Sequence, residues 1–360
     1  ARLGCTVFQY DMMGDSDNNQ ISHEITHRFA RQRAALITDK EWGLYSPQAE
    51  SHLQSILMLQ TWNSMRAIDF VEALEDVDPD RIAVTGASGG GTQTFMVSAL
   101  DPRVKVSMPA VMVSTAMQGG CTCENASLLR INEGNVAFAA LFAPKPLGLT
   151  TANDWTKEMI TKGFPELKKT YEVLGYSQNI MLHNRIEFDH NYNLPSRQSM
   201  YRWFNRHLNL GHEKPEIEKP HKRLTKEELT VWDKDNPMPT GGERFETKLL
   251  SYLTQDITKK ILNDPEVAKK GWEVVLGSDS ERNNEVEWEL TVKNKEDNYV
   301  EMCGLINNIT SKESVPALFL YPKNSWNKRV VIWLTKTGKS GLYKNVDSPS
   351  EVKDEVLHLL

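Results

Sequence analysis

Gly86-Ala87-Ser88-Gly89-Gly90 is the stretch that decides the fold of this chain. It reads G-x-S-x-G, follows the apolar run Arg81–Thr85 and precedes Gly91–Leu100, whose composition suits a helix. A strand, a tight turn at a glycine-flanked serine and a helix together form the context of a nucleophile elbow. Glycine permits the sharp turn and the close approach of strand and helix. We therefore predict that Ser88 is a nucleophile and that the backbone N–H of Gly89 stabilises an oxyanion.

Strand and helix patterns alternate around this elbow through residues 1–208. A helix is expected from Ser46-Pro47, a cap residue followed by proline, with apolar residues at helical spacing as far as Val71. Residues 14–45 form a polar loop, and Pro195–Leu208 forms a closing helix. The strand-like stretches are Cys5–Tyr10, Ile82–Thr85, Val104–Val113, Pro146–Thr151 and Asn179–Ile186. This alternation predicts an α/β fold with a mostly parallel sheet flanked by helices.

The remainder of the chain has a different texture. Residues 209–245 are rich in Pro, Lys and Glu without apolar periodicity, so we expect a linker. Residues 246–360 are expected to form a helix at Thr247–Leu262 and then a β-rich segment with a turn at Asn294–Asn298. Its strand-like stretches are Glu273–Leu276, Val286–Val292, Tyr299–Ile306, Val315–Tyr321 and Arg329–Leu334.

Composition excludes several classes of partner. The 360 residues carry a net charge of −6, which argues against a nucleic-acid partner. No stretch is apolar over enough residues to span a membrane. The cysteines have no disulfide-framework spacing, and the C-x-C pair is too close for an easy bridge; they are Cys5, Cys121, Cys123 and Cys303. A C-x-C pair can bind metal, but without a second pair we predict ordinary thiols, no metal and no cofactor.

Both ends of the sequence are abrupt. Ala1 leads directly into an apolar stretch without an initiator Met or a signal peptide, and Ser350–Leu360 has the pattern of a helix cut short. We therefore expect a fragment of a longer protein, whose localisation neither terminus indicates. Nothing in the sequence indicates the oligomeric state.

A serine esterase on such a sheet needs an acid and then a histidine downstream of its nucleophile. The histidine takes the serine proton, and the carboxylate fixes the histidine tautomer and stabilises its cation. Asp154 follows the predicted strand at 146–151, and His190 follows the one at 179–186, so both lie where these roles are expected. Asp154 could instead serve only as a helix cap. We predict a triad of Ser88, Asp154 and His190.

Neighbouring residues compete for the acid and base roles. Glu187 and Asp189 are close to His190 in sequence, but a sequence neighbour seldom orients its own histidine well. His183 falls in the middle of a predicted strand and His207 on a predicted helix. We expect both to pack or to face solvent rather than to act as the base.

Other motifs suggest other chemistry. Val84–Gly91 resembles the phosphate loop of a short-chain dehydrogenase, but a helix and a strand precede it and no Tyr-x-x-x-Lys pair follows. His23-Glu24-Ile25-Thr26-His27 is a literal H-E-x-x-H, which on a helix would hold zinc with glutamate as base. Its polar flank is a poor start for such a helix, so a zinc metallopeptidase is an alternative and a polar loop beside the active site is preferred. Asp15 and Asp17 lack the register of a calcium loop.

The stretches around these residues resemble the bacterial acetyl-xylan-esterase-like and dienelactone-hydrolase-like α/β hydrolases. The resemblance covers about residues 1–210 and is carried by Asp69-Phe70, Asp78–Thr94, Gln118–Asn125, Ala143–Pro146, Asn153–Thr156 and His190–Asn193. It implies the α/β-hydrolase fold and a cofactor-independent ester hydrolase with Ser88 as nucleophile, Asp154 as acid and His190 as base. It also implies an acyl group, such as acetyl, on a plant or algal polysaccharide as substrate, and export to the periplasm or the medium.

The resemblance further implies that Glu124 and Arg130 lie on a loop near the site, where structural support is at least as expected as substrate contact. One part of the family pattern is displaced. Such hydrolases begin with a hairpin and a strand whose following loop donates the second oxyanion N–H. Asp11–Ser16 resembles a loop beyond that point, whereas Val315–Tyr321 and Arg329–Lys339 resemble the opening strands.

Two arrangements explain this displacement. In the preferred one, residues 1–208 are a catalytic segment, N-terminally incomplete, and residues 246–360 begin a second hydrolase domain. In the alternative, a circular permutant, the late strands complete the first sheet. We predict a serine carboxylic-ester hydrolase acting on a small-molecule or polysaccharide ester. The alternative from another class is a degenerate hydrolase-like module that binds carbohydrate without catalysis; substrate-binding residues are not indicated.

Overall fold

The structure is a computed structural model. It describes residues 1–28, 42–117, 119–131, 133–215, 217–239, 243–276, 285–324, 326–347 and 350–360. Residues 29–41 of the predicted polar loop lie outside this set. The chain divides into two compact units, residues 1–278 and 279–360, and each is described by itself. A search of the described helices finds none that is both long and apolar enough to cross a membrane.

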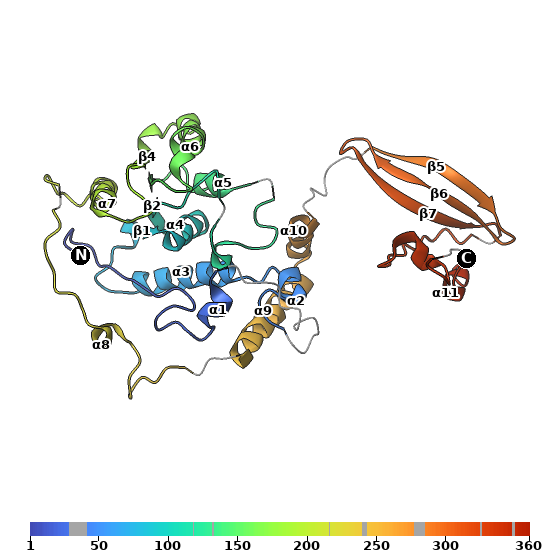
Figure 1. Ribbon diagram of the computed structural model, residues 1–360, viewed down its shortest axis with the longest axis horizontal. Helices are drawn as coiled ribbons and strands as arrows, with labels where there is room; N and C mark the ends of the chain where they lie inside the picture. The colour runs from blue at the N-terminus through green and yellow to red at the C-terminus, as the bar shows by residue number, and fades with distance from the viewer. Residues whose placement is uncertain are drawn as a thin grey trace. The chain divides into compact units, whose positions relative to one another are not determined.

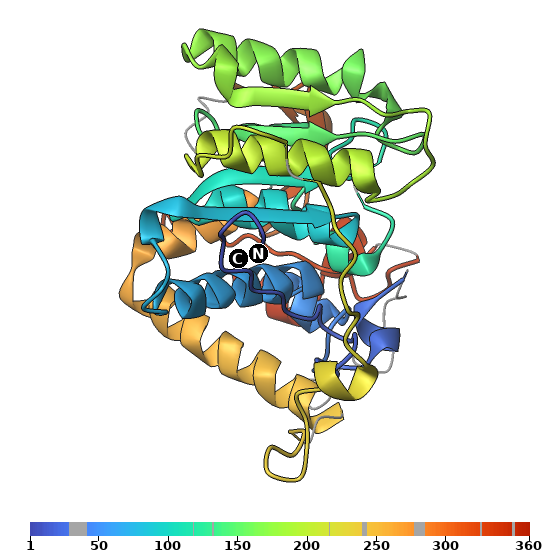
Figure 2. The same cartoon turned by 90° about the vertical axis from the view of Figure 1, so that its left-hand side faces the viewer.

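The first unit is built on a parallel four-stranded sheet with the strand order β1-β2-β3-β4, visible in Figure 2. The strands are β1 (Ile82–Ala87), β2 (Val104–Ala110), β3 (Leu147–Thr150) and β4 (Ile180–His183). Neighbouring strands pair in parallel, with Ala87 opposite Ala110 and Thr150 opposite His183. The prediction of a mostly parallel α/β sheet is confirmed. Each of the four observed strands overlaps one of the predicted strands.

Helices cover both faces of this sheet (Figure 1). Three crossover helices join successive strands: α4 (Gly89–Leu100), α5 (Asn135–Ala140) and α6 (Gly163–Val173). The closing helix α7 (Leu194–His207) lies on the opposite face from α4 and α5 (Figure 1). Residues two apart on a strand share a face, and Val106 and Met108 of β2 pack with Trp203 of α7. Val104 precedes the register shift between Ile82 and Ala83 and packs in the other core, which includes Phe95 of α4. Every residue of β3 is buried, as expected for a central parallel strand.

The elbow between β1 and α4 places its serine in a strained conformation. Ser88 has φ 56° and ψ −124°, in the left-handed half of backbone space that side chains other than glycine rarely adopt. A Cβ on Gly86 would lie 2.5 Å from the carbonyl oxygen of Gly90, so glycine is required there. A Cβ on Gly91 would lie 2.7 Å from Met112 Cβ, whereas one on Gly90 would meet nothing within 4 Å. Close approach therefore depends on Gly86 and Gly91 rather than on both glycines of the motif.

The first residues of the chain do not form the predicted strand at Cys5–Tyr10. They run as extended chain along α3 (Ile56–Glu72), where Phe8 contacts the Phe70 ring at 5.1 Å between centroids. Tyr10 Oη donates a hydrogen bond of 2.6 Å to Ser64 Oγ on the same helix. Side-chain contacts with a helix hold this segment in place, and it forms no hydrogen-bonded strand. Its apolar residues therefore reflect packing against α3 rather than pairing in a sheet.

The helix predicted from Ser46 is divided in two. Ser46 caps α2 (Pro47–Ser51), and Ser55 then caps the separate helix α3. Farther along, α8 (Lys226–Leu229) is a single turn in the predicted linker. The helix α9 (Glu243–Asn263) belongs to the first unit and packs against its N-terminal part. There the Glu246 carboxylate accepts a hydrogen bond of 2.6 Å from the backbone N–H of Leu44. The compact units therefore divide after α9 and its successor α10 (Pro265–Leu276), beyond the boundary expected at residue 246.

The strand predicted at Glu273–Leu276 is wrong, because these residues form the last turn of α10. Pro265 occupies the first helical position, where proline is favoured. The β-branched Val274 and Val275 favour a strand by local propensity, but the helix beginning at Pro265 extends through them.

The second unit contains an antiparallel sheet with the order β5-β6-β7. Its strands are β5 (Val286–Lys295), β6 (Tyr299–Asn308) and β7 (Glu313–Pro322), which confirms three predicted strands and the turn between the first two. The short helix α11 (Asp354–Leu357) follows. Arg329–Leu334, predicted as a strand, has no strand structure and is largely exposed.

The two sheets share no strand among the described residues. The late strands β5–β7 hydrogen-bond to one another in a sheet of their own, and the permuted arrangement, in which they complete the first sheet, stays an alternative. That residues 246–360 begin a second hydrolase domain stays a prediction.

Candidate active site

The sheet brings the three predicted catalytic residues to one edge. Ser88 follows β1 directly, Asp154 follows β3 and His190 follows β4. Because the strands are parallel, their carboxyl ends meet at the same edge, which is where ligands bind in open α/β sheets. The fold therefore collects residues that are far apart in sequence.

Asp154 and His190 form a hydrogen-bonded pair. Asp154 Oδ2 lies 2.7 Å from His190 Nδ1, and the carboxylate is 5% exposed while the imidazole is 34% exposed. A carboxylate oxygen accepts, so Nδ1 carries the proton and, in the neutral ring, Nε2 keeps its lone pair. An acid that is buried and a base that remains accessible is the arrangement a proton shuttle requires.

Thr156 orients the acid, and sequence analysis did not single it out. Asp154 Oδ1 accepts hydrogen bonds from the backbone N–H of Thr156 at 2.7 Å and from its hydroxyl at 2.5 Å. These bonds occupy Oδ1 and leave Oδ2 for His190. The D-x-T spacing is a local Asx-type signal that could have identified Thr156. Asp154 thus acts as a local cap and a histidine partner at once, so the two interpretations of it are compatible.

Trp155 forms one wall beside the histidine. Its ring centroid lies 4.5 Å from that of His190, and its carbonyl accepts a short hydrogen bond from Ser114 Oγ. No hydrogen bond joins Ser88 Oγ to His190, and both residues belong to the described ranges. Catalytic hydrogen bonds commonly tighten only when substrate binds.

The competing residues have other partners. Glu187 pairs with Arg185 at 2.6 Å, and Asp189 is not the carboxylate that contacts His190. His183 and His207 each have a buried Nε2 without a hydrogen-bond partner. Burial, with a contribution from Arg206, lowers the pKa of His207 to about 4. Both of these histidines have a buried ring nitrogen, as expected of packed residues, and that neither is the base stays a prediction.

The oxyanion position lies at the start of α4. Gly89 is the first helical residue, where backbone N–H groups have no intrahelical partner. Glu124 approaches the same place: its Oε1 would lie 3.5 Å from a Cβ on Gly89, and Thr92 Oγ1 donates to it at 3.4 Å. Burial raises the pKa of the Glu124 carboxyl.

Arg130 holds the loop that carries Glu124. Its guanidinium donates to the carbonyl oxygen of Glu124 at 3.0 Å, to Asn125 Oδ1 at 3.3 Å and to Asn135 Oδ1 at 2.8 Å. These bonds give Arg130 a structural role in the loop.

The H-E-x-x-H stretch does not form a zincin helix. The helix α1 is a single turn, His23–Thr26, and His27 lies beyond it with extended backbone. The His27 Nε2 that would bind zinc instead lies 2.7 Å from the carbonyl oxygen of Met13, to which it must donate a proton. The metallopeptidase alternative therefore lacks both its helix and its second free nitrogen.

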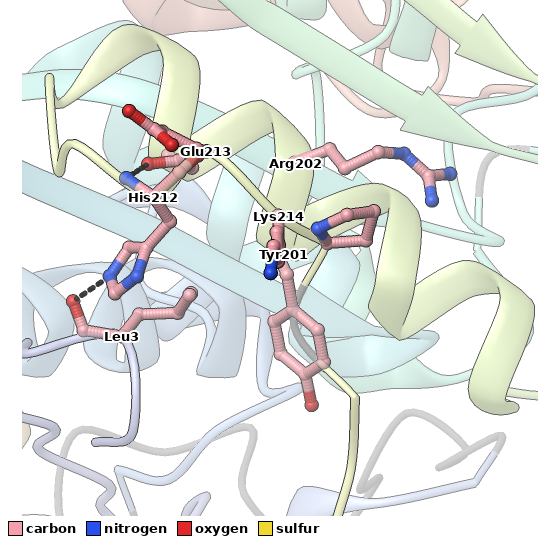
Figure 3. A pocket seen from close by; sticks show the side chains of 8 residues that line it. Leu3, Tyr201, Arg202, His212, Glu213 and Lys214 are labelled. Atoms are coloured by element: carbon pink, nitrogen blue, oxygen red, sulfur yellow. Dashed lines mark hydrogen bonds between the residues drawn. The ribbon is translucent and has the colours of Figure 1, made fainter.

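A small pocket on α7 is separate from these residues. Figure 3 shows its lining, in which His212 donates to the carbonyl oxygen of Leu3 at 3.0 Å beside Tyr201 and Arg202. None of the three predicted triad residues lines it.

Comparison with known proteins gives partial matches. Residues 19–132, which include the elbow, match the family described as glucuronyl esterase, fungi. YtaP of Bacillus subtilis (strain 168), provisionally named a hydrolase, is 40% identical over 48 residues, which are 13% of this chain and 16% of that protein.

Two solved esterases match the chain in part. The methylesterase BT1017 is 22% identical with a TM-score of 0.46, covering 71% of this chain and 53% of its own. A carbohydrate esterase family 15 glucuronoyl esterase from Caldicellulosiruptor kristjansonii is 17% identical with a TM-score of 0.38, covering 52% and 58%. This chain thus spans only part of each relative.

The first unit has the parallel sheet and nucleophile elbow of an α/β hydrolase. The α/β-hydrolase fold is therefore the fold of this unit, and the part of it at residues 19–132 is similar to an esterase family.

Proposed function

We propose that the first unit is a serine carboxylic-ester hydrolase that acts on carbohydrate esters. The observation that carries this proposal is the buried Asp154 bound to Nδ1 of His190 at the sheet edge where the strained elbow presents Ser88. An accessible imidazole with its Nε2 lone pair free is the base that a serine hydroxyl needs.

The reaction follows from these positions. Ser88 Oγ attacks the ester carbonyl carbon while its proton passes to His190 Nε2, and Asp154 stabilises the resulting imidazolium. The backbone N–H of Gly89 donates to the oxyanion of the tetrahedral intermediate. The alcohol leaves with the proton from His190, which leaves an acyl group on Ser88. Water then attacks this acyl-enzyme with His190 as base, which releases the acid and restores the serine.

The substrate side of the proposal has two forms. In an acetyl ester the carbohydrate supplies the alcohol, whereas in a glucuronoyl ester the carbohydrate supplies the carboxyl group. The resemblance of the sequence favours the first, and the family matched by residues 19–132 favours the second. Hydrolysis of an acetylated xylan oligosaccharide and of an alkyl glucuronate, compared by kcat/KM on one preparation, distinguishes the two.

Ser88→Ala tests the proposed mechanism. We expect kcat for a chromogenic ester to fall by about 10⁵-fold with an unchanged circular dichroism spectrum, because no other group replaces the nucleophile. Ser51→Ala, at an exposed serine of α2, is the matched control. Activity that survives in Ser88→Ala and disappears with a chelator would instead support a metallohydrolase. Binding of oligosaccharide without turnover by the natural sequence would support the non-catalytic module.

A further inference from the structure

His27, Cys121 and Cys123 form a compact cluster on the loops of the first unit. One ring nitrogen and the two sulfurs all lie within 4.8 Å of one another. His27 Nδ1 is 3.7 Å from Cys121 Sγ. All three cysteines of the first unit are free thiols, and the Cys123 side chain is buried. The esterase mechanism uses none of these groups.

The orientation of His27 is fixed from its other nitrogen. Nε2 lies 2.7 Å from the carbonyl oxygen of Met13 and 3.3 Å from Asp15 Oδ2. A carbonyl oxygen only accepts, so Nε2 carries the proton, and the neutral ring must direct the lone pair of Nδ1 toward the thiols. A ring nitrogen that donates to a carbonyl or carboxylate while the other faces a ligand sphere is the usual state of a metal-bound histidine.

The backbone closes the cluster from the side of Cys121. The N–H of Arg28 donates to Cys121 Sγ at 2.9 Å, and the N–H of Thr122 donates to the carbonyl oxygen of Arg28 at 2.7 Å. These bonds join the segment at residues 27–28 to the segment at residues 121–122. They therefore hold the His27 imidazole next to the Cys121 thiol without a bound ligand.

Two polar side chains lie beside the thiols. The amide of Gln60 is 2% exposed and pairs with the Cys123 thiol. Tyr45 pairs with Thr122 and packs in the same cluster as both cysteines. The thiols therefore share a pocket with polar groups that can support a bound ion.

We propose that His27 Nδ1, Cys121 Sγ and Cys123 Sγ bind a zinc-class divalent metal ion. Two thiolates and an imidazole are a donor set that zinc prefers. With zinc–sulfur and zinc–nitrogen bonds of about 2.3 and 2.0 Å, tetrahedral geometry separates sulfur and nitrogen by about 3.5 Å. The observed 3.7 Å between Cys121 Sγ and His27 Nδ1 is close to that separation. The amide of Gln60 beside Cys123, or a water, supplies the fourth ligand of the proposed site.

This site differs from the one that H-E-x-x-H would form. A metal between Asp15, His23 and His27 needs Nε2 of His27, which Met13 already occupies. The Cys2His site uses the opposite nitrogen and does not involve His23. It also ties down the turn η3 (Thr122–Glu124), whose last residue lies beside Gly89. The metal ion therefore stabilises the loop next to the oxyanion position without taking part in the proposed hydrolysis.

Metal analysis of the purified full chain, dialysed after exposure to Zn²⁺, tests the proposal. We expect about one zinc ion per chain, and an affinity at least about 100-fold lower in Cys121→Ser and Cys123→Ser, since losing even an outer-shell partner costs 10–100-fold. His23→Gln and Cys303→Ser are the matched controls, and both should retain the metal.

Two measurements on the unaltered sequence avoid dependence on the folding of variants. Co²⁺ in place of zinc should give the visible absorption of tetrahedral thiolate coordination. Zinc should also slow alkylation of Cys121 and Cys123, but not of Cys303, when the sites are quantified by mass spectrometry. Absence of bound metal, no thiolate absorption with Co²⁺, or equal loss of zinc in His23→Gln would each overturn the proposal.

Discussion

His190 and His27 lie in two regions of the first unit and differ in which ring nitrogen is anchored. At the sheet edge, Asp154 holds Nδ1 of His190 at 2.7 Å and leaves Nε2 for proton transfer. In the loop cluster, the Met13 carbonyl holds Nε2 of His27 at 2.7 Å and leaves Nδ1 facing two thiols. The same side chain is thereby directed to two kinds of chemistry. The anchoring partner, rather than the histidine, decides which lone pair is available.

Among changes at the residues that anchor the two histidines, replacing Asp154, the carboxylate that anchors His190, should have the largest effect on activity. We expect Asp154→Asn to lower kcat by about 10³–10⁴-fold, because the amide stabilises neither the required tautomer nor the imidazolium. Steady-state kinetics on a chromogenic ester measures this effect. Asp189→Asn, adjacent in sequence to His190, should change kcat by less than about threefold. Equal losses in the two variants would mean that Asp154 is only a helix cap.

Removing the support of that anchor should have a smaller effect. Thr156→Val deletes one of the two hydrogen bonds to Asp154 Oδ1. We expect kcat to fall by about tenfold, roughly 1.4 kcal/mol, with KM unchanged, since the acid loses orientation and not charge. Thr156→Ser should restore most of the rate. A variant that raises KM and leaves kcat intact would assign Thr156 to substrate binding instead.

The anchor of His27 should tolerate loss of its carboxylate. Asp15→Asn weakens the 3.3 Å contact, but the 2.7 Å bond to the Met13 carbonyl remains. We expect the zinc affinity to fall by no more than about tenfold, at the lower end for an outer-shell residue. Competition with a chromogenic chelator measures the affinity. A loss as large as that of Cys121→Ser would show that Asp15 is itself a ligand.

His207 differs from both histidines because its buried Nε2 has no hydrogen-bond partner. We expect this difference to affect the stability of the fold as pH changes. Burial lowers its pKa to about 4, whereas the unfolded chain protonates near 6.5. The unfolded state therefore binds a proton first as pH falls, so the stabilisation present above about pH 6.5 is lost between there and about pH 4. His207→Gln should flatten this decline, measured as the urea midpoint at about pH 7 and pH 4.5. The exposed His52→Gln should leave it unchanged.

Local sequence signals predicted the central part of the fold well. The β1–Ser88–α4 unit is encoded by adjacent residues, and Asp154 and His190 were found because they follow strands whose pattern is local. The errors fall where an apolar pattern has no strand partner. Cys5–Tyr10 rests on α3, Glu273–Leu276 completes a helix, and Arg329–Leu334 remains outside the three-stranded sheet.

The interaction of His27 with Cys121 could not be predicted from spacing. The two residues are 94 positions apart, and each belongs to a motif that suggests something else when read alone. The C-x-C pair lacked a second pair, and the H-E-x-x-H histidines suggested a partnership with each other. Hydrogen bonds from the backbone N–H of Arg28 to Cys121 and from that of Thr122 to Arg28 bring the imidazole to the thiols in the folded chain.

The sequence by itself determined the parallel sheet, the elbow at Ser88 and the strand ends that Asp154 and His190 follow, because each depends on residues that are neighbours along the chain. The tertiary structure alone decided which nitrogen of each histidine is free and which glycines the elbow requires. Those properties depend on atoms a few ångströms apart in space, such as Met13 O beside His27 or Met112 Cβ above Gly91. Hydrogen-bond direction and close packing are set by that proximity, and no local pattern encodes it.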